Sequence, residues 1–337
     1  NGTIMITTIE DYREQRRRLP FLPYENLVGH HGADRCGIAE KVLDSGWKIG
    51  PYDSFLLDTI PWESSEKISR SWSFQIHSWH MLDDLLAAYS VSGEKRFFDP
   101  ALGVALDWAM KFSSFETPCT FAWYDMAVGL RAYRLAYIID AAARLDEVPD
   151  IDFSSLLDAL ARHRKYLSEE GNIAFHSNHG FYQAAGQLAM ARRLKDLPGM
   201  ERAMKQALER FRKILAMQFS LEGVHLEHSP DYHWMICQAL RGILDANIFD
   251  DEDITASCRK IEESLSWFVM PHGYLANFGD SDYRRMFINS ACEARWKTPA
   301  MIYSTSGGLH GKPPDKDVRV FESAGYFIAR TWNASAA

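Results

Sequence analysis

The sequence predicts a mainly α-helical fold of stacked antiparallel helix hairpins, which gives way to β-structure near the C-terminal end. Three observations lead to this prediction. Apolar residues recur at helical spacing over most of the 337 residues. Loops with unusual histidine and aromatic residues return about every 50 residues, the length of one helix hairpin with its loops. After residue 305 the helical spacing stops, and short β-like stretches follow.

The helical stretches are separated by polar loops that are rich in aromatic residues. Helices are expected near residues 35–46, 74–91, 97–112, 125–145, 153–168, 179–196, 199–218, 231–248 and 252–270. Segments 20–32 and 44–65 are rich in proline, glycine and aromatic residues, which predicts irregular structure there.

The C-terminal stretch follows the helix breaker Ser306-Gly307-Gly308. Val318 to Ser323 and Tyr326 to Arg330 flank Ala324-Gly325, which predicts a β-hairpin. We therefore expect a β-domain of which this chain holds only the beginning.

The composition is ordinary for a globular protein, with 47% hydrophobic and 24% charged residues. The formal net charge of −8 argues against nucleic acid as the main partner, because phosphate binding requires a basic surface. No apolar run approaches the ~20 residues of a membrane helix, so no membrane partner is expected. No secretory signal is visible in the polar N-terminal stretch, where Arg16-Arg17-Arg18 is expected on the solvated surface.

Cysteine and histidine spacing gives little support for a metal site. His77-x-x-His80 and His225-x-x-His228, with His233 nearby, have a spacing that can chelate a metal. No cysteine or carboxylate completes a familiar ligand set, so we expect no metal and no cofactor, but aromatic packing or sugar contacts. The five cysteines are widely separated and are expected as single thiols: Cys36, Cys119, Cys237, Cys258 and Cys292.

The unusual loops define a candidate site if the hairpins stack. Stacked hairpins place equivalent loops on the same side. A toroid of antiparallel helix pairs would therefore gather five loops on one face. These loops are His77–His80, Trp123–Asp125, Asn178-His179, Tyr232-His233 and Gly279-Asp280.

Two of these loops open strong helices. Asn178 can cap its helix, but His179 is unusual beside the positive end of a helix. Ser229 and Pro230 form a good helix start, which puts Tyr232 in the first turn. One interpretation is two capped helices with an imidazole and an aromatic ring packed nearby. The other is that the asparagine, histidine and tyrosine surround a carboxylate, because helix N-termini bind anions.

Aromatic residues in or beside these loops offer faces on which sugar rings can stack. They are Trp72, Trp79, Trp123, Tyr124 and Trp234. Ordinary packing at helix ends is the alternative, and the residues alone leave both open.

In order and spacing, these segments resemble the heparinase II/III group of polysaccharide lyases, and related alginate lyases share the Asn-His-Gly helix start. Asn178-His179-Gly180 is followed after 54 residues by Tyr232, which lies in a Ser-Pro-x-Tyr-His segment. Further similar segments are Trp123-x-Asp125 with Arg131-Ala-x-Arg134, Asn277 to Asp282, and Phe321 to Arg330. The resemblance covers roughly residues 70–330. It implies an incomplete (α/α) toroid, expected over residues 1–304, and the beginning of a truncated antiparallel β-sandwich over residues 305–337.

The resemblance implies β-elimination at a uronic acid of an anionic polysaccharide or oligosaccharide. The C5 proton is removed, the C4–O bond breaks and a C4=C5 double bond forms. Asn178, helped by His179, would bind the carboxylate, and Tyr232 would be the acid and the base. A basic Tyr232 requires nearby positive charge, from a helix end or from His179, His233 or Arg131. Expected substrate contacts are His80, Trp123, Tyr124, Arg131, His233 and Trp234.

Other interpretations stay open. Family members often use a further histidine from the β-sandwich, and this chain is expected to end before it. An (α/α) toroid glycoside hydrolase would need two carboxyl groups about 5–10 Å apart, from Asp125, Glu227, Asp280 or Asp282. A non-catalytic carbohydrate-binding fragment would bind sugar without turnover. Processing of uronate polymers suggests a periplasmic or secreted location.

Overall fold

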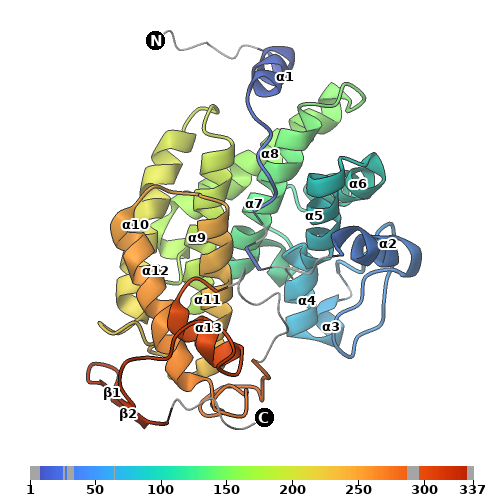
Figure 1. Ribbon diagram of the computed structural model, residues 1–337. Coiled ribbons are helices and arrows are strands. Elements are labelled where there is room, and N and C mark those ends of the chain that lie inside the picture. Colours follow the sequence, from blue (N-terminus) through green and yellow to red (C-terminus); the bar gives the residue numbers. More distant parts are fainter. Residues whose placement is uncertain (1–7, 26, 29–33, 64, 287–295, 332–337) are drawn as a thin grey trace. The chain divides into compact units, whose positions relative to one another are not determined.

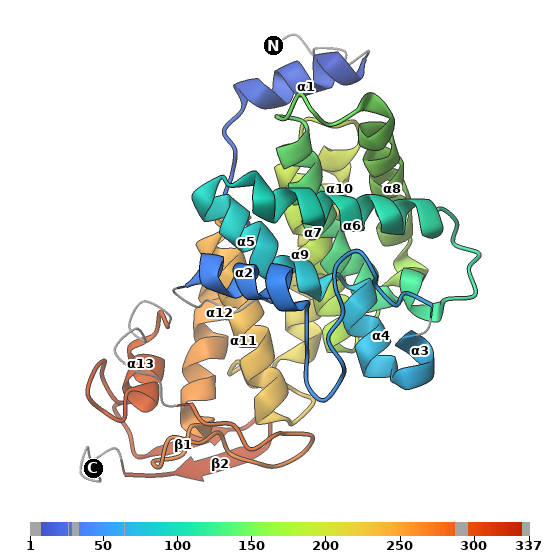
Figure 2. The same ribbon diagram turned by 90° about the vertical axis from the view of Figure 1, so that its right-hand side faces the viewer.

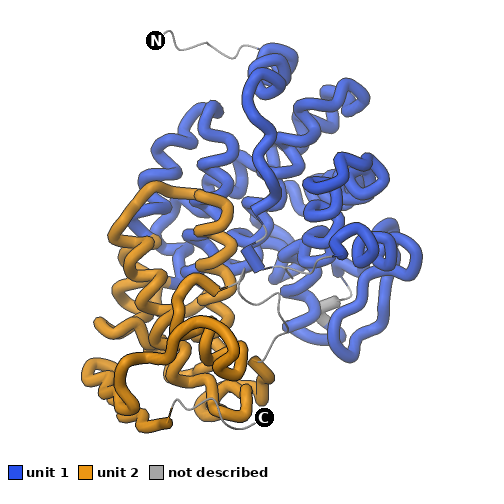
Figure 3. The backbone as a smooth tube through the Cα atoms, viewed as in Figure 1, with its two compact units in different colours: residues 1–174, 179–210 blue, residues 175–178, 211–337 orange. Residues whose placement is uncertain are grey.

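The computed structural model describes residues 8–25, 27–28, 34–63, 65–286 and 296–331. These residues are mainly helical, and a β-hairpin lies near the C-terminal end (Figures 1 and 2). The mainly α prediction is confirmed. The chain divides into two compact units, residues 1–174 with 179–210 and residues 175–178 with 211–337 (Figure 3).

Each predicted helix has a counterpart, whereas α1, α3 and α13 are not predicted from the spacing. The elements in chain order are α1 (Ile9–Arg18), α2 (Arg35–Ser45), α3 (Ser65–Ile68), α4 (Arg70–His77), α5 (Asp83–Ser92), α6 (Lys95–Lys111), α7 (Asp125–Ala142), α8 (Asp150–Ser168), α9 (Asn178–Arg193), α10 (Met200–Gln218), α11 (Pro230–Asp245), α12 (Glu252–Leu265), α13 (Pro299–Thr305), β1 (Val318–Phe321) and β2 (Tyr326–Ala329).

Helix α7 forms the centre of the first unit. Every residue from Ala127 to Ala142 is buried, so the helix has no solvent-facing stripe over this stretch. Helix α9 meets α7 at backbone contact: a Cβ on Gly129 would lie 2.5 Å from the Cα of Gln183. A Cβ on Gly186 would lie 1.9 Å from the carbonyl oxygen of Gly129. Glycine at both positions therefore allows α7 and α9 to approach this closely.

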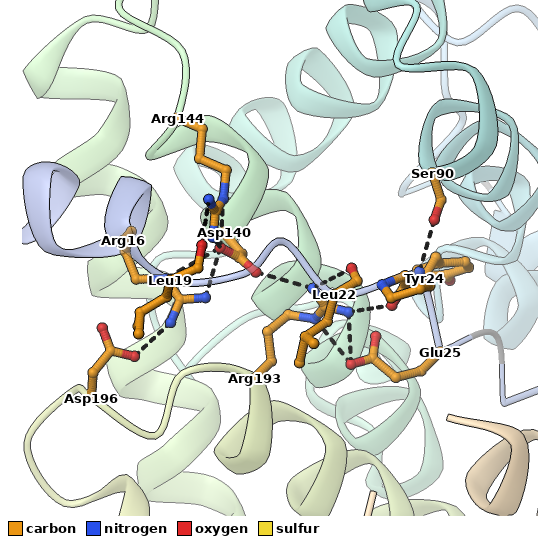
Figure 4. A network of polar contacts seen from close by, with 11 residues as sticks. Arg16, Leu19, Leu22, Tyr24, Glu25, Ser90, Asp140, Arg144, Arg193 and Asp196 are labelled. Carbon is orange, nitrogen blue, oxygen red and sulfur yellow. Dashed lines mark hydrogen bonds and ion pairs between the residues drawn. The ribbon is translucent and has the colours of Figure 1, made fainter. Parts of the chain in front are cut away.

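A buried ion-pair network joins the N-terminal segment to α7 and to the end of α9 (Figure 4). Arg16 of α1 pairs with Asp140 and with Asp196, each at 2.6 Å. Arg193 pairs with Glu25 at 2.9 Å and with the other oxygen of Asp140 at 3.0 Å. The alternation of sign leaves each of these buried charges with an opposite partner, which a low-dielectric interior requires.

The prediction of a solvated arginine run is wrong at Arg16. Its side chain is 3% exposed, whereas that of Arg18 is 70% exposed and pairs with Glu14 of its own helix. The carboxylate of Asp140 that receives Arg16 lies 124 residues away in the chain, so a local charge pattern does not reveal it.

The helix predicted near residues 74–91 is broken into α4, a 3₁₀ turn at residues 80–82 and α5. The break occurs at Trp79, which has a left-handed φ of 65° and is fully buried. Arg131 donates to the carbonyl of His77, and Arg134 donates to that of Ser78 at 2.6 Å. Side chains from α7 thus satisfy carbonyls that a continuous helix would have used, which makes the break possible.

In the second unit, α11 and α12 lie side by side (Figures 1 and 2). Helix α11 begins as predicted, with Pro230 first and the Ser229 hydroxyl accepting from the backbone N–H of Tyr232 at 3.3 Å. Asp251 caps α12 through the N–H of Ile254. Both helices therefore start at side-chain caps.

The predicted hairpin is confirmed, with β1 and β2 antiparallel in the register Val318↔Ala329 to Phe321↔Tyr326. Phe321 is buried and stacks on Phe268, which anchors the hairpin to the end of α12. The boundary at residue 304 and the start of a β-sandwich stay predictions.

Among the described residues, no helix is long and apolar enough to cross a membrane. Four cysteines have free thiols, as expected: Cys36, Cys119, Cys237 and Cys258. Cys292 lies outside the described residues.

Candidate active site

The first unit holds a histidine–carboxylate pair at two helix starts. His179 lies in the first turn of α9, and Asp125 is the first residue of α7. The Nδ1 atom of His179 lies 3.1 Å from an oxygen of Asp125. An ionised carboxylate only accepts hydrogen bonds, so the Nδ1 atom of His179 carries a proton. The side chains are 33% and 24% exposed, so this pair reaches solvent.

Two of the expected aromatic contacts, Tyr124 and Trp123, differ in how far they are exposed. The ring of Tyr124 meets His179 edge-on at 5.8 Å, and Tyr124 is half-buried. Trp123 is only 8% exposed, packs on Trp108 and donates to the carbonyl of Ser114 at 2.8 Å. Tyr124 therefore keeps a face for a ligand, whereas Trp123 serves mainly as packing.

Arg131, predicted from the sequence as a substrate contact, lies in the interior of the first unit. The side chain is fully buried and donates to His163 at 2.8 Å and to the carbonyl of Ala122 at 2.7 Å, besides that of His77. Its guanidinium lies 3.8 Å from the ring centre of Trp108, and burial holds its pKa well below the usual range. Arg131 joins the loop at residues 77–80 to the turn at residues 120–123, so it supports the site from within.

His80 lies in that first loop and is half-buried. Its ring meets Phe74 edge-on at 6.0 Å, and its Nδ1 lies 3.4 Å from the carbonyl of Gln75. Its neighbour His77 is buried, and burial with the nearby charge of Arg131 lowers the pKa of His77 to about 3. Of the two histidines, only His80 keeps partial exposure.

The second unit holds a tyrosine–carboxylate pair. The hydroxyl of Tyr232, in the first turn of α11, donates to an oxygen of Asp280 at 2.7 Å. Tyr232 is half-buried and Asp280 is exposed. The hydrogen bond to Asp280, with burial and the charge of that carboxylate, raises the pKa of Tyr232 to about 12. The positive surroundings that a phenolate base requires are therefore not what the structure provides here.

The loop that carries Asp280 is fastened to the start of α11. The hydroxyl of Ser229 donates to the carbonyl of Asp280 at 2.8 Å, and Ser281 accepts from the N–H of Asp231 at 3.3 Å. Gly279 has a φ of 62°, and a Cβ there would lie 2.4 Å from the carbonyl oxygen of His228. Only glycine fits this close, left-handed crossing, which fixes where Asp280 stands.

His233 also differs from the expectation of a substrate contact. It is 1% exposed, and its Nε2 lies 2.8 Å from the carbonyl of Ile261. Burial, and the neighbouring His225, lower its pKa to about 3, so the ring is neutral at ordinary pH. His233 therefore supplies no positive charge to Tyr232 and belongs to the packing below α11.

Trp234 is half-buried and is paired with Arg284, a cation that was not predicted from the sequence. Arg284 lies 4.0 Å from its ring centre and binds both oxygens of Asp231, at 2.5 and 3.2 Å. Arg284 follows the segment Asn277 to Asp282 by two residues, which is the one signal that pointed to this loop. The pairing places one aromatic and one cationic side chain at the same helix start as Tyr232.

Asn178 is the first residue of α9 and is half-buried. The preceding segment is held by Gln218, which donates to the carbonyl of Ser177 at 2.6 Å and to that of Phe175 at 3.1 Å. The capping role of Asn178 stays a prediction. Over the described ranges, no group of three or more histidine, cysteine or acidic side chains is arranged to hold a metal ion.

The five predicted loops are brought together in two groups. In the first unit, Arg131 joins the loop of His77 to the turn before Tyr124, and Asp125 binds His179. In the second unit, the start of α11 binds the loop of Asp280. The prediction that all five share one face stays a prediction.

Comparison with solved structures defines the class of the fold. The chain is similar to heparan sulfate lyase HepC from Pedobacter heparinus, with a TM-score of 0.66, 18% identity, and coverage of 95% of this chain and 53% of that chain. It is similar to a heparinase III structure with a TM-score of 0.72, 18% identity, and coverage of 96% and 55%. The fold is therefore that of the helical part of heparinase-type lyases, which confirms the predicted fold class.

The sequence comparisons go one step further. The chain is 23% identical over 319 residues to a heparin-sulfate lyase of Bacteroides thetaiotaomicron, covering 84% of this chain and 44% of that protein. The family described as Heparinase II/III N-terminus matches residues 38–296, well over half of the chain. The protein belongs to this family. It spans about half the length of the relatives that it matches.

Proposed function

We propose that this chain carries the helical catalytic part of a polysaccharide lyase, which cleaves a uronic-acid-containing polysaccharide by β-elimination. The observation that supports this best is the family match, because residues 38–296 include both Asn178-His179 and Tyr232. The similar proteins are a heparin-sulfate lyase and a heparan sulfate lyase, which favours a glycosaminoglycan as the substrate. Such a polymer lies outside the cytoplasm, so we propose a periplasmic or secreted location.

The reaction requires that the uronate carboxylate be neutralised, because negative charge spreads onto it as the C5 proton leaves. In the proposal Asn178 donates to this carboxylate, and His179 helps as a second donor. The hydrogen bond from Nδ1 to Asp125 supports the role of His179, because it orients the ring and stabilises a positive charge on it. A donor placed at developing charge contributes roughly 10²–10³-fold to the rate.

Tyr232 is the proposed acid and base. Its position in the first turn of α11 and its partial exposure support contact with a substrate. Its raised pKa supports a neutral phenol in the resting protein. Candidate sugar contacts are His80, Tyr124 and Trp234, which are half-buried. Arg131 and His233 are not proposed as sugar contacts, because both side chains are buried.

The experiment is a spectroscopic screen for the product. A C4=C5 double bond conjugated with the carboxylate absorbs in the ultraviolet, and hydrolysis does not create it. The protein is incubated with heparan sulfate, hyaluronan, alginate and a bacterial glucuronate-containing polysaccharide. We expect absorbance to rise, most strongly with heparan sulfate. Shorter, saturated products would instead support the glycoside hydrolase, and binding without any product would support the carbohydrate-binding fragment.

A further inference from the structure

We infer that Asp280 acts through Tyr232 as a positioning residue that takes up the phenolic proton. The two side chains then form a proton relay. In this relay Tyr232 serves first as base and then as acid without becoming a free phenolate. This inference rests on the proposed function and deepens it.

The hydrogen bond between Tyr232 and Asp280 runs from the phenol to the carboxylate. The phenol donates its proton to Asp280 at 2.7 Å, since an ionised carboxylate can only accept. The lone pairs of the phenol oxygen then point away from Asp280. A phenol arranged in this way is ready to accept a proton from a substrate while it passes its own proton back.

Asp280 is also held in place by its backbone. Ser229 binds its carbonyl, Ser281 is bound to the same helix start, and Gly279 allows the close crossing. The carboxylate is therefore fixed by its backbone rather than by a second cation. It has no arginine or lysine among its described hydrogen-bond and ion-pair partners, so no such cation competes with the phenol for its carboxylate oxygens.

The charged groups that act on the phenol of Tyr232 are acidic. Asp280 from the loop, and Glu227 and Asp231 from its own segment, all oppose ionisation of Tyr232. The nearby cation Arg284 is bound to Asp231 instead. Because its pKa is raised to about 12, the phenol of Tyr232 stays protonated at ordinary pH and a free phenolate base is scarce.

The relay carries one proton from C5 of the uronate to the leaving oxygen. The C5–H bond breaks and the proton bonds to the phenol oxygen, while the original phenolic proton moves to the carboxylate of Asp280. The C4–O bond then breaks and the C4=C5 bond forms. The leaving oxygen takes the proton from Tyr232, and Tyr232 takes its proton back from Asp280. One proton has moved from C5 to the leaving oxygen, and both side chains are restored.

The variant Asp280→Asn tests the relay, because an amide can accept the hydrogen bond but does not take up the proton. We expect kcat to fall by roughly 10²–10⁴-fold at every pH, and Asp280→Glu to recover part of it. The exposed Asp250 in the same unit provides a control, and Asp250→Asn should leave kcat unchanged.

A second measurement does not depend on turnover. Tyrosine labelled with ¹³C at Cζ reports ionisation by NMR, and the Tyr232 signal is the one missing in Tyr232→Phe. We expect Tyr232 to stay protonated through pH 11 in the wild type, and its pKa to fall toward about 10 in Asp280→Asn. Failure of this fall would overturn the inference whether or not the chain is active.

The kinetic and NMR measurements together distinguish the relay from a free phenolate base. A phenolate base would become more abundant in Asp280→Asn and raise the rate below pH 10, which contradicts the relay. An Asp280→Asn variant with unchanged kcat also contradicts it. If the wild type makes no unsaturated product from any uronate polymer, the proposed function fails, and the NMR result still decides whether Asp280 opposes ionisation of the phenol.

Discussion

The two ring–carboxylate pairs of this protein are built alike and do opposite things. His179 with Asp125 and Tyr232 with Asp280 both stand in the first turn of a helix, and both rings donate to a carboxylate. For the imidazole the carboxylate fixes the tautomer and stabilises a cation. For the phenol it opposes the anion and raises the pKa to about 12. The same partner therefore prepares one ring to hold positive charge and keeps the other neutral.

The pairs also differ in what supports them. Below the pair in the first unit lies Arg131, a buried cation between tryptophan rings that binds two loop carbonyls. Beside the pair in the second unit, neutral hydroxyls and a glycine crossing fasten the loop. The first support depends on one side chain, whereas the second is spread over several weak contacts. Single substitutions should therefore damage the first support more.

The largest effect on stability is expected for Arg131→Met. The methionine fills much of the space but leaves the carbonyls of His77 and Ala122 without their donor, at about 1–3 kcal/mol each. Urea unfolding should show this loss. Ser229→Ala, which removes the hydroxyl that caps α11 and binds Asp280 and Ser281, should cost only about 1 kcal/mol. Equal losses in the two variants would contradict the difference between the supports.

A smaller, catalytic effect is expected for Asp125→Asn. The amide no longer stabilises positive charge on His179, so kcat/KM should fall by about 10–100-fold. Because Asp125 acts through the histidine, the substitution should cause little further loss in a His179→Ala background. Additive losses in the double variant would show that Asp125 acts independently of His179.

The smallest effect concerns the buried histidine below the second pair. The unfolded chain binds a proton at His233 near pH 6.5, whereas the folded protein binds it only near pH 3, so stability is lost as the pH falls below 6.5. At pH 5 this amounts to about 2 kcal/mol relative to pH 8. Urea unfolding at both pH values should show about that much less loss in His233→Gln. The exposed His272 serves as the control, and His272→Gln should match the wild type.

Local signals in the sequence predicted the parts of this fold that local contacts decide. Ser229-Pro230 starts α11 and Ala324-Gly325 turns the hairpin, because caps and turns depend on neighbouring residues. The break at Trp79 was not predictable in this way, since the donors to the carbonyls of His77 and Ser78 are Arg131 and Arg134, more than 50 residues later.

The candidate site follows the same division. The ring side chains His179 and Tyr232 could be singled out from helix starts and from the family resemblance. Their carboxylates come from 54 and 48 residues away, so no spacing assigned Asp125 or Asp280 to them. The burial of Arg131 and His233 was missed for a related reason, because arginine and histidine are usually exposed and only tertiary contacts show otherwise.

The most direct test of the central claim compares the wild type with Tyr232→Phe on heparan sulfate by ultraviolet absorbance of the C4=C5 bond. The substitution removes only the hydroxyl of the half-buried Tyr232 and should leave the free energy of unfolding nearly unchanged. We expect steady formation of unsaturated product by the wild type and none above background by the variant. Equal rates in the two proteins would contradict this expectation, because Tyr232 would then take no part in the elimination.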